Sequence, residues 1–308
     1  TILLATHNRA HLIRETLDSI LGQTYSKWEC IIVDDYSSDN TKKVVESYIK
    51  RDERFSYHLK ISDYKKGLSG TRNYGLDLAR ERGAEFIQFF DDDDIVHPQN
   101  LQLCIRELKS ENYDFCRVGR ETFTGNFTKD FLKISSYEIH TLDFKNFEDV
   151  IIGKIPFNSC QVMWKEKCFE TNKFNEDLMY AEEWELYSRI LANSMIKGVN
   201  IKKTLYFARK HSKSNTGEFW RGNKKRFDSQ IKAVKLVIKH LKRKNYLSKT
   251  LIRHFVQMGI FLKEISIINY LFKNANISLL LKCRYYLLYY FYPIIGRLYR
   301  IKKRLLIG

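Results

Sequence analysis

FIQFFDDDDIVHP, residues 86–98, places four consecutive aspartates directly after an apolar run. The run Phe86–Phe90 is typical of a buried strand, and no loop separates it from Asp91–Asp94. Carboxylates at a partly desolvated strand end repel one another, so such a cluster either binds protons more tightly or recruits a cation. A solvated acidic turn is the alternative, but such turns more often mix glycine, asparagine, serine and lysine. The stretch favours a site for Mg²⁺ or Mn²⁺ that also binds substrate phosphates.

The first hundred residues alternate between short apolar runs and helical patterns. Four apolar runs predict strands, and the segments between them carry apolar residues at helical spacing. The predicted strands are residues 2–5, 30–33, 55–59 and 86–90, and the predicted helices include residues 13–21, 44–49 and 72–79. This order predicts an α/β fold, with a doubly wound, mostly parallel sheet and helices on both faces.

Three of the predicted strands end in polar clusters. These clusters are THNR (6–9), DDYSSD (34–39) and DDDD (91–94). The carboxyl ends of parallel strands meet at one edge of a sheet, and ligands bind there in folds of this class. We therefore expect the three clusters to converge and form a single site.

Four motifs, in this order and spacing, resemble the family 2 glycosyltransferases of GT-A fold. They are LLATHNR (3–9), VDDYSSDNT (33–41), GLSGTRNYGLDLA (67–79) and FFDDDDIVHP (89–98). The resemblance covers about residues 1–216. It implies a GT-A domain over 1–216, with a nucleotide-sugar-binding half (1–105) and an acceptor half that carries the catalytic base (106–216). It also implies an inverting, metal-dependent reaction.

The resemblance implies roles for the residues of the donor site. Asp93 corresponds to the main ligand of Mn²⁺ or Mg²⁺, with Asp91 as a further ligand, and either Asp91 or Asp92 lies nearer the ribose. Asp35 is expected to accept a hydrogen bond from a uracil base, and His7 to stack on that base. A surface position is the alternative for an arginine or a histidine in such loops. The remaining expected contacts to the nucleotide-sugar are Thr6, Asn8, Arg9, Asp34, Arg72 and His211.

The catalytic base is expected in AEEWEL, residues 181–186, where an apolar helical face begins. The family has Glu-Asp at this place, with the aspartate as base. Here Glu183 replaces the aspartate, with a side chain one methylene longer, and Glu182 is the alternative base. The alternative is that neither glutamate is catalytic. Acidic residues are common at helix N-termini because they complement the helix dipole.

The formal charge of +17 is concentrated in the C-terminal part of the chain. Residues 229–308 hold 17 Lys/Arg and one acid, Glu264, whereas residues 1–228 hold 36 basic and 35 acidic residues. The nearly neutral body argues against nucleic acid as a partner. We therefore expect residues 217–308 to form a separate basic, aromatic-rich helical tail.

Three interpretations of the tail remain open. An apolar stripe of Ile231, Val234, Ile238 and Leu241 runs beside a stripe of lysines, and an aromatic run with a basic end follows in residues 278–308. The tail either caps the body, binds nucleic acid or lies on an anionic membrane surface. The aromatic run favours the membrane, on the inner face of the cell membrane, although its charges argue against a transmembrane helix.

Other patterns limit the class of function. The six cysteines form no CxxC pair, which is typical of free thiols in a reducing, cytoplasmic compartment, and no stretch resembles a signal peptide. The absence of GxxxxGKS/T and of a GxGxxG after a strand argues against P-loop and dinucleotide enzymes. The resemblance to family 2 glycosyltransferases implies transfer of a sugar from a UDP-sugar to a glycan or polyprenyl-diphosphate-linked acceptor, in cell-surface polysaccharide synthesis. A nucleotidyltransferase-like enzyme, a non-catalytic nucleotide-sugar-binding relative and a membrane-anchored scaffold are the alternatives.

Overall fold

The computed structural model describes residues 1–211 and 214–305, with side chains for 1–211 and 214–292. The chain divides into two compact units, Thr1–Gln230 and Ile231–Gly308. The second unit begins within helix α8 (Lys224–Arg243), later than the boundary at residue 217 that the sequence suggests.

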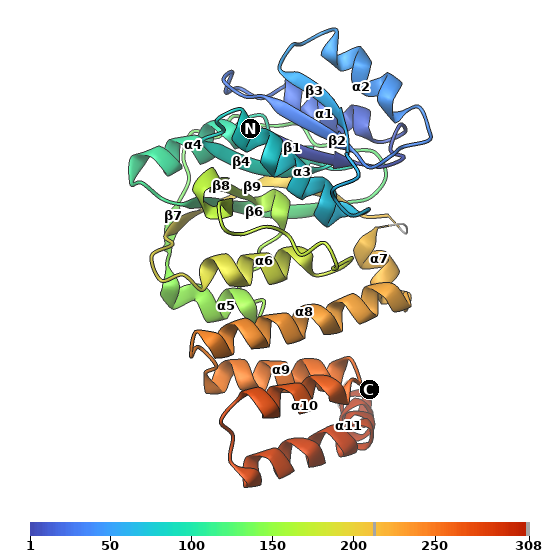
Figure 1. Cartoon of the computed structure of the whole chain (residues 1–308), viewed down its shortest axis with the longest axis vertical. Coiled ribbons are helices and arrows are strands. Elements are labelled where there is room, and N and C mark those ends of the chain that lie inside the picture. The colour runs from blue at the N-terminus through green and yellow to red at the C-terminus, as the bar shows by residue number, and fades with distance from the viewer. Residues whose placement is uncertain (212–213, 306–308) are drawn as a thin grey trace. The chain divides into compact units, whose positions relative to one another are not determined.

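A mixed nine-stranded sheet forms the centre of the first unit (Figure 1). Its order is β3-β2-β1-β4-β8-β6-β9-β5, and β7 pairs with β9. Strands β1–β4, β6 and β9 run in one direction and the other three run against them, which confirms the mostly parallel α/β prediction. The strands are β1 (Ile2–Thr6), β2 (Cys30–Asp34), β3 (Phe55–Leu59), β4 (Phe86–Asp91), β5 (Ile95–Val96), β6 (Phe115–Phe123), β7 (Ile139–Leu142), β8 (Val162–Lys165) and β9 (Gly198–Arg209).

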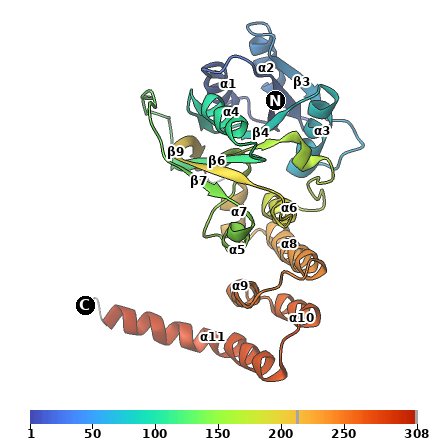
Figure 2. The same ribbon diagram turned by 90° about the vertical axis from the view of Figure 1, so that its left-hand side faces the viewer.

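Helices cover both faces of this sheet (Figure 1 and Figure 2). Because side chains alternate along a strand, Ile2 and Leu4 of β1 join one core with Leu17 of α1. Leu3 faces the other side, where Gly75 lets α3 approach closely. The helices are α1 (Ile13–Leu21), α2 (Thr41–Ile49), α3 (Leu68–Glu81), α4 (Asn100–Ser110), α5 (Phe147–Ile151), α6 (Glu182–Leu191), α7 (Asn215–Trp220) and α8, with short 3₁₀ helices η1 (Phe144–Asn146), η2 (Ser159–Gln161) and η3 (Glu166–Phe169).

Strand β8 enters the sheet between β4 and β6 and runs antiparallel to both. Phe86 pairs with Lys165 and Gln88 with Met163, so the chain just before β8 lies toward the carboxyl end of β4. This reversal brings η2 to the edge of the sheet where β4 presents its aspartates.

The second unit is helical, with α9 (Lys249–Phe261), α10 (Ile265–Asn274) and α11 (Leu279–Leu305) after the greater part of α8. Val234, Ile238 and Leu241 of the predicted apolar stripe are buried, and Lys239 and Lys242 beside it are exposed. The stripe therefore belongs to a protein core and leaves α8 no broad apolar face for lipid.

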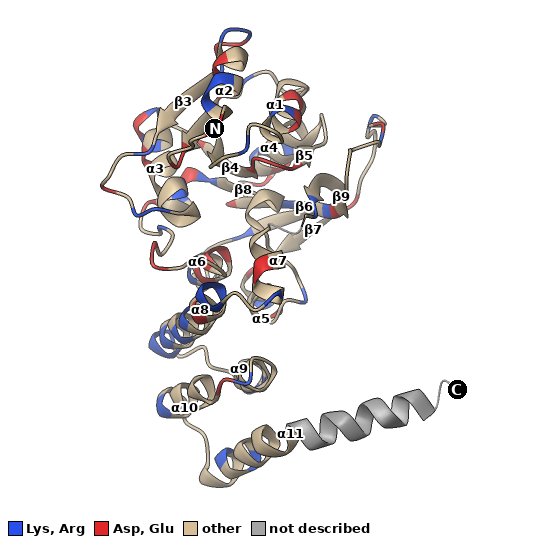
Figure 3. Ribbon diagram, turned by 90° about the vertical axis from the view of Figure 1, so that its right-hand side faces the viewer, with Lys and Arg blue, Asp and Glu red and all other residues tan. Residues whose placement is uncertain are grey.

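Helix α11 differs from α8 because large apolar side chains on its first half are exposed. Leu280 is 83% exposed, Leu287 58% and Phe291 51%. Figure 3 shows blue segments along the helices of this unit and a single red segment between α9 and α10, where the sequence has Glu264. The basic end of the tail, residues 293–308, lies outside the described side chains. Among the residues that the structure describes, none of the helices combines the length and the hydropathy that crossing a bilayer requires.

Gly70 of α3 leaves no space for a side chain. A Cβ at this position would lie 2.1 Å from the carbonyl oxygen of Lys65. We predict that Gly70→Ala lowers the free energy of unfolding by about 1–3 kcal/mol, because backbone must move to relieve the clash. Urea-induced unfolding measures this change. Gly75→Ala is the matched control, since its Cβ would meet the Leu3 side chain at 3.4 Å and alanine favours helix. Equal losses in the two variants would contradict the prediction.

Candidate active site

Three polar clusters meet at the carboxyl edge of the parallel strands, as the sequence predicts. Thr6 at the end of β1 lies beside Asp34 at the end of β2, and Ala5 lies beside Asp91 at the end of β4. The clusters follow three adjacent strands. They therefore form one candidate site.

Asn8 fixes the loop after β1 to the loop after β2. It has a left-handed φ of 54°, which asparagine adopts more readily than most residues. Its side-chain oxygen accepts hydrogen bonds from the backbone N–H groups of Ser38 (2.8 Å) and Asp39 (3.3 Å). His7 beside it is exposed, and its Nδ1 lies 2.7 Å from the carbonyl oxygen of Asp35. Asn8 thus holds the loop, and His7 lies at its surface.

The two aspartates after β2 have separate partners. Asp34 is buried, and its oxygens accept hydrogen bonds from the N–H of Ser37 (2.7 Å) and the hydroxyl of Tyr57 (2.8 Å). Both oxygens of Asp34 are thus engaged within the protein, where they hold its own loop and β3 together.

Asp35 forms an ion pair with Lys60, which the sequence analysis did not single out. Lys60 is 1% exposed, and its Nζ lies 2.6 Å from Oδ1 of Asp35. The other oxygen of Asp35 accepts the N–H of Gly67 at 2.7 Å. Removing one partner of such a buried pair leaves an uncompensated charge, so each partner fixes the other. A lysine just after a strand looks like any surface lysine in the sequence, and only its burial reveals this contact.

Asp91 and Asp92 bind arginines from different parts of the chain. Asp91 accepts a hydrogen bond from Nη2 of Arg72 at 2.9 Å, and Arg72 is only 3% exposed, so a surface position for this arginine is wrong. Asp92 accepts one from Nε of Arg9 at 3.2 Å. Burial raises the pKa of Asp92 to about 7; the charge of Asp93 adds to this effect and that of Arg9 opposes it.

Asp93 and Asp94 bind the segment at the end of β9. Nε2 of His211 lies 2.7 Å from Oδ2 of Asp93. Asp94 accepts hydrogen bonds from the hydroxyl of Tyr206 (2.6 Å) and the N–H of Arg209 (2.7 Å). Burial raises the pKa of Asp94 well above its ordinary range, and the neighbouring carboxylates add to this effect. The guanidinium of Arg209 donates to the carbonyl oxygen of Asp93 at 2.9 Å, so the end of β9 positions both members of the Asp93–His211 pair.

Glu182 and Glu183 at the start of α6 have different surroundings. The side chain of Glu183 is 26% exposed, and its Oε2 lies 4.0 Å from Nη1 of Arg72. Glu182 is buried, which raises its pKa to about 7; the charge of Glu183 adds to this effect and that of Arg72 opposes it. Glu183 is thus the more accessible carboxylate. Like Asp91, it faces the guanidinium of Arg72.

Two residues that belong to no motif bind Glu183. Ser159 donates to Oε2 from its N–H (2.9 Å) and from its hydroxyl (2.6 Å), and Asn158 donates to Oε1 (3.3 Å). Both residues lie in the chain before β8, where the sequence shows no pattern that points to the site. The antiparallel entry of β8 brings them there.

The donor atoms in the site fit a hard divalent cation. Asp91 is the more open carboxylate, with 43% of its side chain exposed, and Asp93 lies beside the imidazole of His211. Carboxylate oxygens and imidazole are ligands for Mn²⁺, and carboxylates suit Mg²⁺.

A second grouping of possible ligands is less suitable. Ligand atoms of Asp91, Asp94 and Cys160 lie within 4.8 Å of one another. Both oxygens of Asp94 already accept hydrogen bonds from Tyr206 and Arg209, however. Burial also raises the pKa of the Cys160 thiol, which disfavours the thiolate that binds metal. Of this grouping, Asp91 alone thus remains a suitable ligand for the cation.

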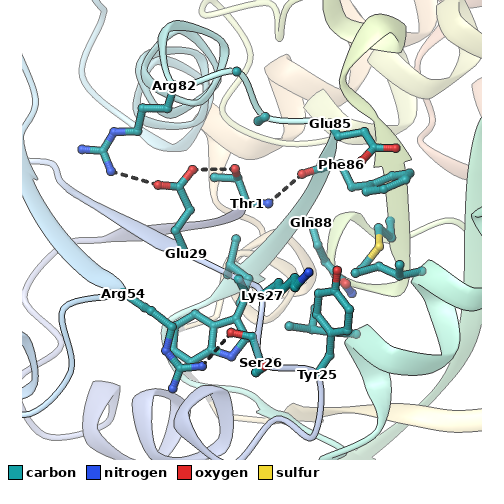
Figure 4. Close-up of a pocket in the computed structure, with 17 residues that line it drawn as sticks. Thr1, Tyr25, Ser26, Lys27, Glu29, Arg54, Arg82, Glu85, Phe86 and Gln88 are labelled. Atoms are coloured by element: carbon teal, nitrogen blue, oxygen red, sulfur yellow. Dashed lines mark hydrogen bonds and ion pairs between the residues drawn. The ribbon is translucent and has the colours of Figure 1, made fainter.

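A cavity of about 470 Å³ lies at the other edge of the sheet, where β1 and β4 begin (Figure 4). Thr1, Glu29 and Phe86 are among its lining residues, and Arg82 pairs with Glu29 at 3.1 Å. Among the described residues, those that line it include none of the predicted site residues. The polar clusters at the carboxyl edge, and not this cavity, thus define the candidate site.

Comparison with known sequences identifies relatives that transfer sugars. The chain is 31% identical over 191 residues to the GalNAc(5)-diNAcBac-PP-undecaprenol beta-1,3-glucosyltransferase of Campylobacter jejuni, covering 61% of this chain and 58% of the relative. It is 36% identical over 127 residues to the UDP-Glc:alpha-D-GlcNAc-diphosphoundecaprenol beta-1,3-glucosyltransferase WfgD of Escherichia coli, covering 41% and 47%. The chain thus spans only about half of the length of these relatives.

Solved structures share the fold. TarS 1-349 of S. aureus, in complex with UDP, has a TM-score of 0.64 at 20% identity, over 87% of this chain and 78% of that chain. The mannosyltransferase PcManGT from Pyrobaculum calidifontis, with GDP-Man and Mn²⁺, has a TM-score of 0.54 at 15% identity, over 90% and 75%. These similarities confirm the GT-A-like α/β fold.

The family model described as glycosyl transferase family 2 matches residues 1–169, which is more than half of the chain. The four motifs that resemble this family lie within the match. The chain therefore belongs to glycosyl transferase family 2.

Proposed function

We propose that this enzyme moves a hexose or N-acetylhexosamine from a UDP-sugar to a lipid-linked glycan, with Mn²⁺ or Mg²⁺ and with inversion at the anomeric carbon. The observation that carries the proposal is that Asp91 and Glu183 both face the guanidinium of Arg72, while Asp93, two residues after Asp91, lies 2.7 Å from His211. The names of the two relatives include undecaprenol-linked acceptors, and one includes UDP-Glc. Both support a role in capsule, lipopolysaccharide or exopolysaccharide synthesis.

The residues of the site divide the work of donor binding. Asp35, fixed by Lys60 and Gly67, would face the uracil base, and the exposed His7 ring would stack on it. Asp91 and Asp93 would hold the cation, with His211 beside them. When bound, the cation neutralises the charge that develops on the leaving diphosphate.

Glu183 supplies the base for the transfer. The acceptor hydroxyl oxygen forms a bond to the anomeric carbon while the bond from that carbon to the diphosphate oxygen breaks, and UDP leaves with the electron pair. The proton of the hydroxyl passes to Glu183, which must lie within hydrogen-bond reach of it. Glu183 is the more exposed of the two carboxylates near Arg72, which favours it over the buried Glu182.

The exposed apolar side chains of α11 support attachment of the tail to a membrane surface. Leu280, Leu287 and Phe291 are exposed on a helix that also carries Lys282 and Arg284. Apolar and aromatic side chains can enter the headgroup region while basic side chains pair with anionic lipid. Attachment to the inner face of the cell membrane would place the enzyme beside a lipid-linked acceptor.

Metal-dependent binding of UDP tests the donor site. We expect UDP with Mn²⁺ to raise the melting temperature, since a ligand at a hundredfold excess over its Kd stabilises the folded state by about 2.7 kcal/mol. UDP without metal, and GDP, ADP, CMP and TDP with metal, should give smaller shifts. Asp93→Asn should remove the metal-dependent part, whereas the exposed Asp130→Asn serves as a control. Full metal dependence in Asp93→Asn would show that another residue holds the cation.

Transfer assays on the two glutamates test the base. We expect Glu183→Gln to bind UDP and Mn²⁺ normally and to lose transfer by at least about 100-fold. The assay offers UDP-glucose, UDP-galactose and their N-acetylamino forms with undecaprenyl-diphosphate-linked GlcNAc or GalNAc. Glu182→Gln should retain transfer. Unimpaired turnover in Glu183→Gln, with loss in Glu182→Gln, would reverse the assignment.

The free energy of unfolding of Glu182→Gln, relative to the unaltered protein, should depend on pH. The pKa of Glu182 is about 7 in the folded protein against an ordinary 4.5. The folded state therefore binds this proton more tightly, so its contribution to stability is complete below about pH 4.5 and is lost as pH rises to about 7. Glu182→Gln should accordingly raise stability at pH 8, by at most about 3 kcal/mol, and change it little near pH 4.5.

Flotation with lipid vesicles tests the tail. We expect the enzyme to bind vesicles that contain phosphatidylglycerol, and to bind less in 0.5 M salt, because screening weakens attraction to anionic lipid. Replacing Leu280, Leu287 and Phe291 by glutamate should abolish binding. Leu132→Glu, at an 83% exposed position in the first unit, is the matched control. Undiminished binding of the triple variant would refute this role for α11.

A further inference from the structure

Ser159 connects the base to the donor side of the site. It is 1% exposed and lies in η2, which no motif marks. Its hydroxyl lies 2.6 Å from Oε2 of Glu183 and 3.0 Å from Nη1 of Arg72. Arg72 in turn donates to Asp91 from its other terminal nitrogen at 2.9 Å. Side chains from four separate elements thus form one continuous hydrogen-bonded chain.

The chemistry of the groups fixes the direction of this chain. Arginine has only donors, and a serine hydroxyl has one proton to give. Nη1 of Arg72 must therefore donate to the Ser159 oxygen, and the Ser159 hydroxyl must donate to Glu183. The backbone N–H of Ser159 donates to the same Oε2 at 2.9 Å. Alanine at this position could not bridge Arg72 and Glu183, because its side chain has neither a donor nor an acceptor.

The two oxygens of Glu183 are held unequally. Oε2 accepts two short hydrogen bonds from Ser159, whereas Oε1 accepts one longer bond of 3.3 Å from Asn158. Oε1 therefore has more freedom to accept a further proton. Fixing one oxygen of a flexible carboxylate reduces the number of orientations available to the other.

We propose that Ser159 is a positioning residue that anchors Oε2 of Glu183 so that Oε1 takes the proton of the acceptor hydroxyl. The inference rests on the proposed role of Glu183 as base. It also accounts for a glutamate at this place, because the longer side chain reaches Ser159. An aspartate would fall short by about one carbon–carbon bond, roughly 1.5 Å. Since Ser159 also binds Arg72, the position of the base is tied to the carboxylate of Asp91.

A double-mutant cycle with Ser159→Ala and Glu183→Asp tests the proposal. The assay uses the donor and acceptor pair that gives most transfer with the unaltered enzyme, together with titration of UDP and Mn²⁺. We expect Ser159→Ala to lower kcat by about 100-fold, the size of effect that misplacing a catalytic group can have. KM for the donor and the affinity for UDP with Mn²⁺ should stay within about twofold. In Glu183→Asp the same substitution should cost less than about threefold, because the anchor is already lost.

Matched variants separate positioning from folding. Ser188→Ala removes another buried serine on the base helix, whose hydroxyl donates to the Trp184 carbonyl at 2.7 Å, and should leave kcat within about twofold. Ser159→Thr keeps the hydroxyl and should restore most of kcat. If threonine does not fit, Ser159→Cys, with a weaker donor, should lie between serine and alanine. Melting temperatures with UDP and Mn²⁺ establish that each variant is folded.

The outcomes distinguish the proposal from the function on which it rests. Wild-type kcat in Ser159→Ala, while Glu183→Gln is inactive, would overturn the role of Ser159 and leave Glu183 as base. Equal losses from Ser159→Ala in both backgrounds, with weaker UDP binding, would show a structural role only and would also overturn it. An active Glu183→Gln would overturn the base assignment and the positioning role together.

Discussion

Four adjacent carboxylates at the end of a buried strand are the constraint on which the site depends. Left unpaired, they would destabilise the fold through mutual repulsion and desolvation. The structure gives Asp91–Asp94 partners from separate segments, namely Arg72, Arg9, His211 and Tyr206. Satisfying the charges therefore also assembles the site, because each partner brings its own element to the strand end. The buried pair of Asp35 and Lys60 does the same for the neighbouring loop.

The sequence predicts the half of the site whose residues follow strands. The apolar runs, the turns and the four motifs are local patterns, so β1–β4, the convergence of the clusters and the fold class could all be derived from them. Within this half of the site, the sequence could not decide whether Arg72 lies at the surface. The structure decides it, because the Arg72 side chain is buried. Ser159 and Lys60 could not be found in this way, because their roles arise from contacts between elements distant in the chain.

The tail shows a different limit of sequence patterns. The stripe of Val234, Ile238 and Leu241 satisfies an amphipathic pattern equally well against lipid or against protein, since both are apolar. The structure buries this stripe and exposes the apolar residues of α11 instead. An amphipathic pattern therefore predicts that one face of a helix contacts an apolar surface, but it does not specify whether that surface is protein or lipid. The distinction requires the positions of the neighbouring helices.

The antiparallel course of β8 separates two kinds of change that the enzyme can undergo. The groups that we propose to bind the nucleotide come from loops that leave parallel strands, whereas Ser159 comes from the segment that enters β8. An insertion or deletion in residues 152–158 would thus alter the surroundings of Glu183, the proposed base, without changing the register of β1, β2 or β4. Loops tolerate such length changes better than strands. If the proposed roles hold, this topology lets acceptor preference diverge among homologous chains while nucleotide recognition is inherited intact.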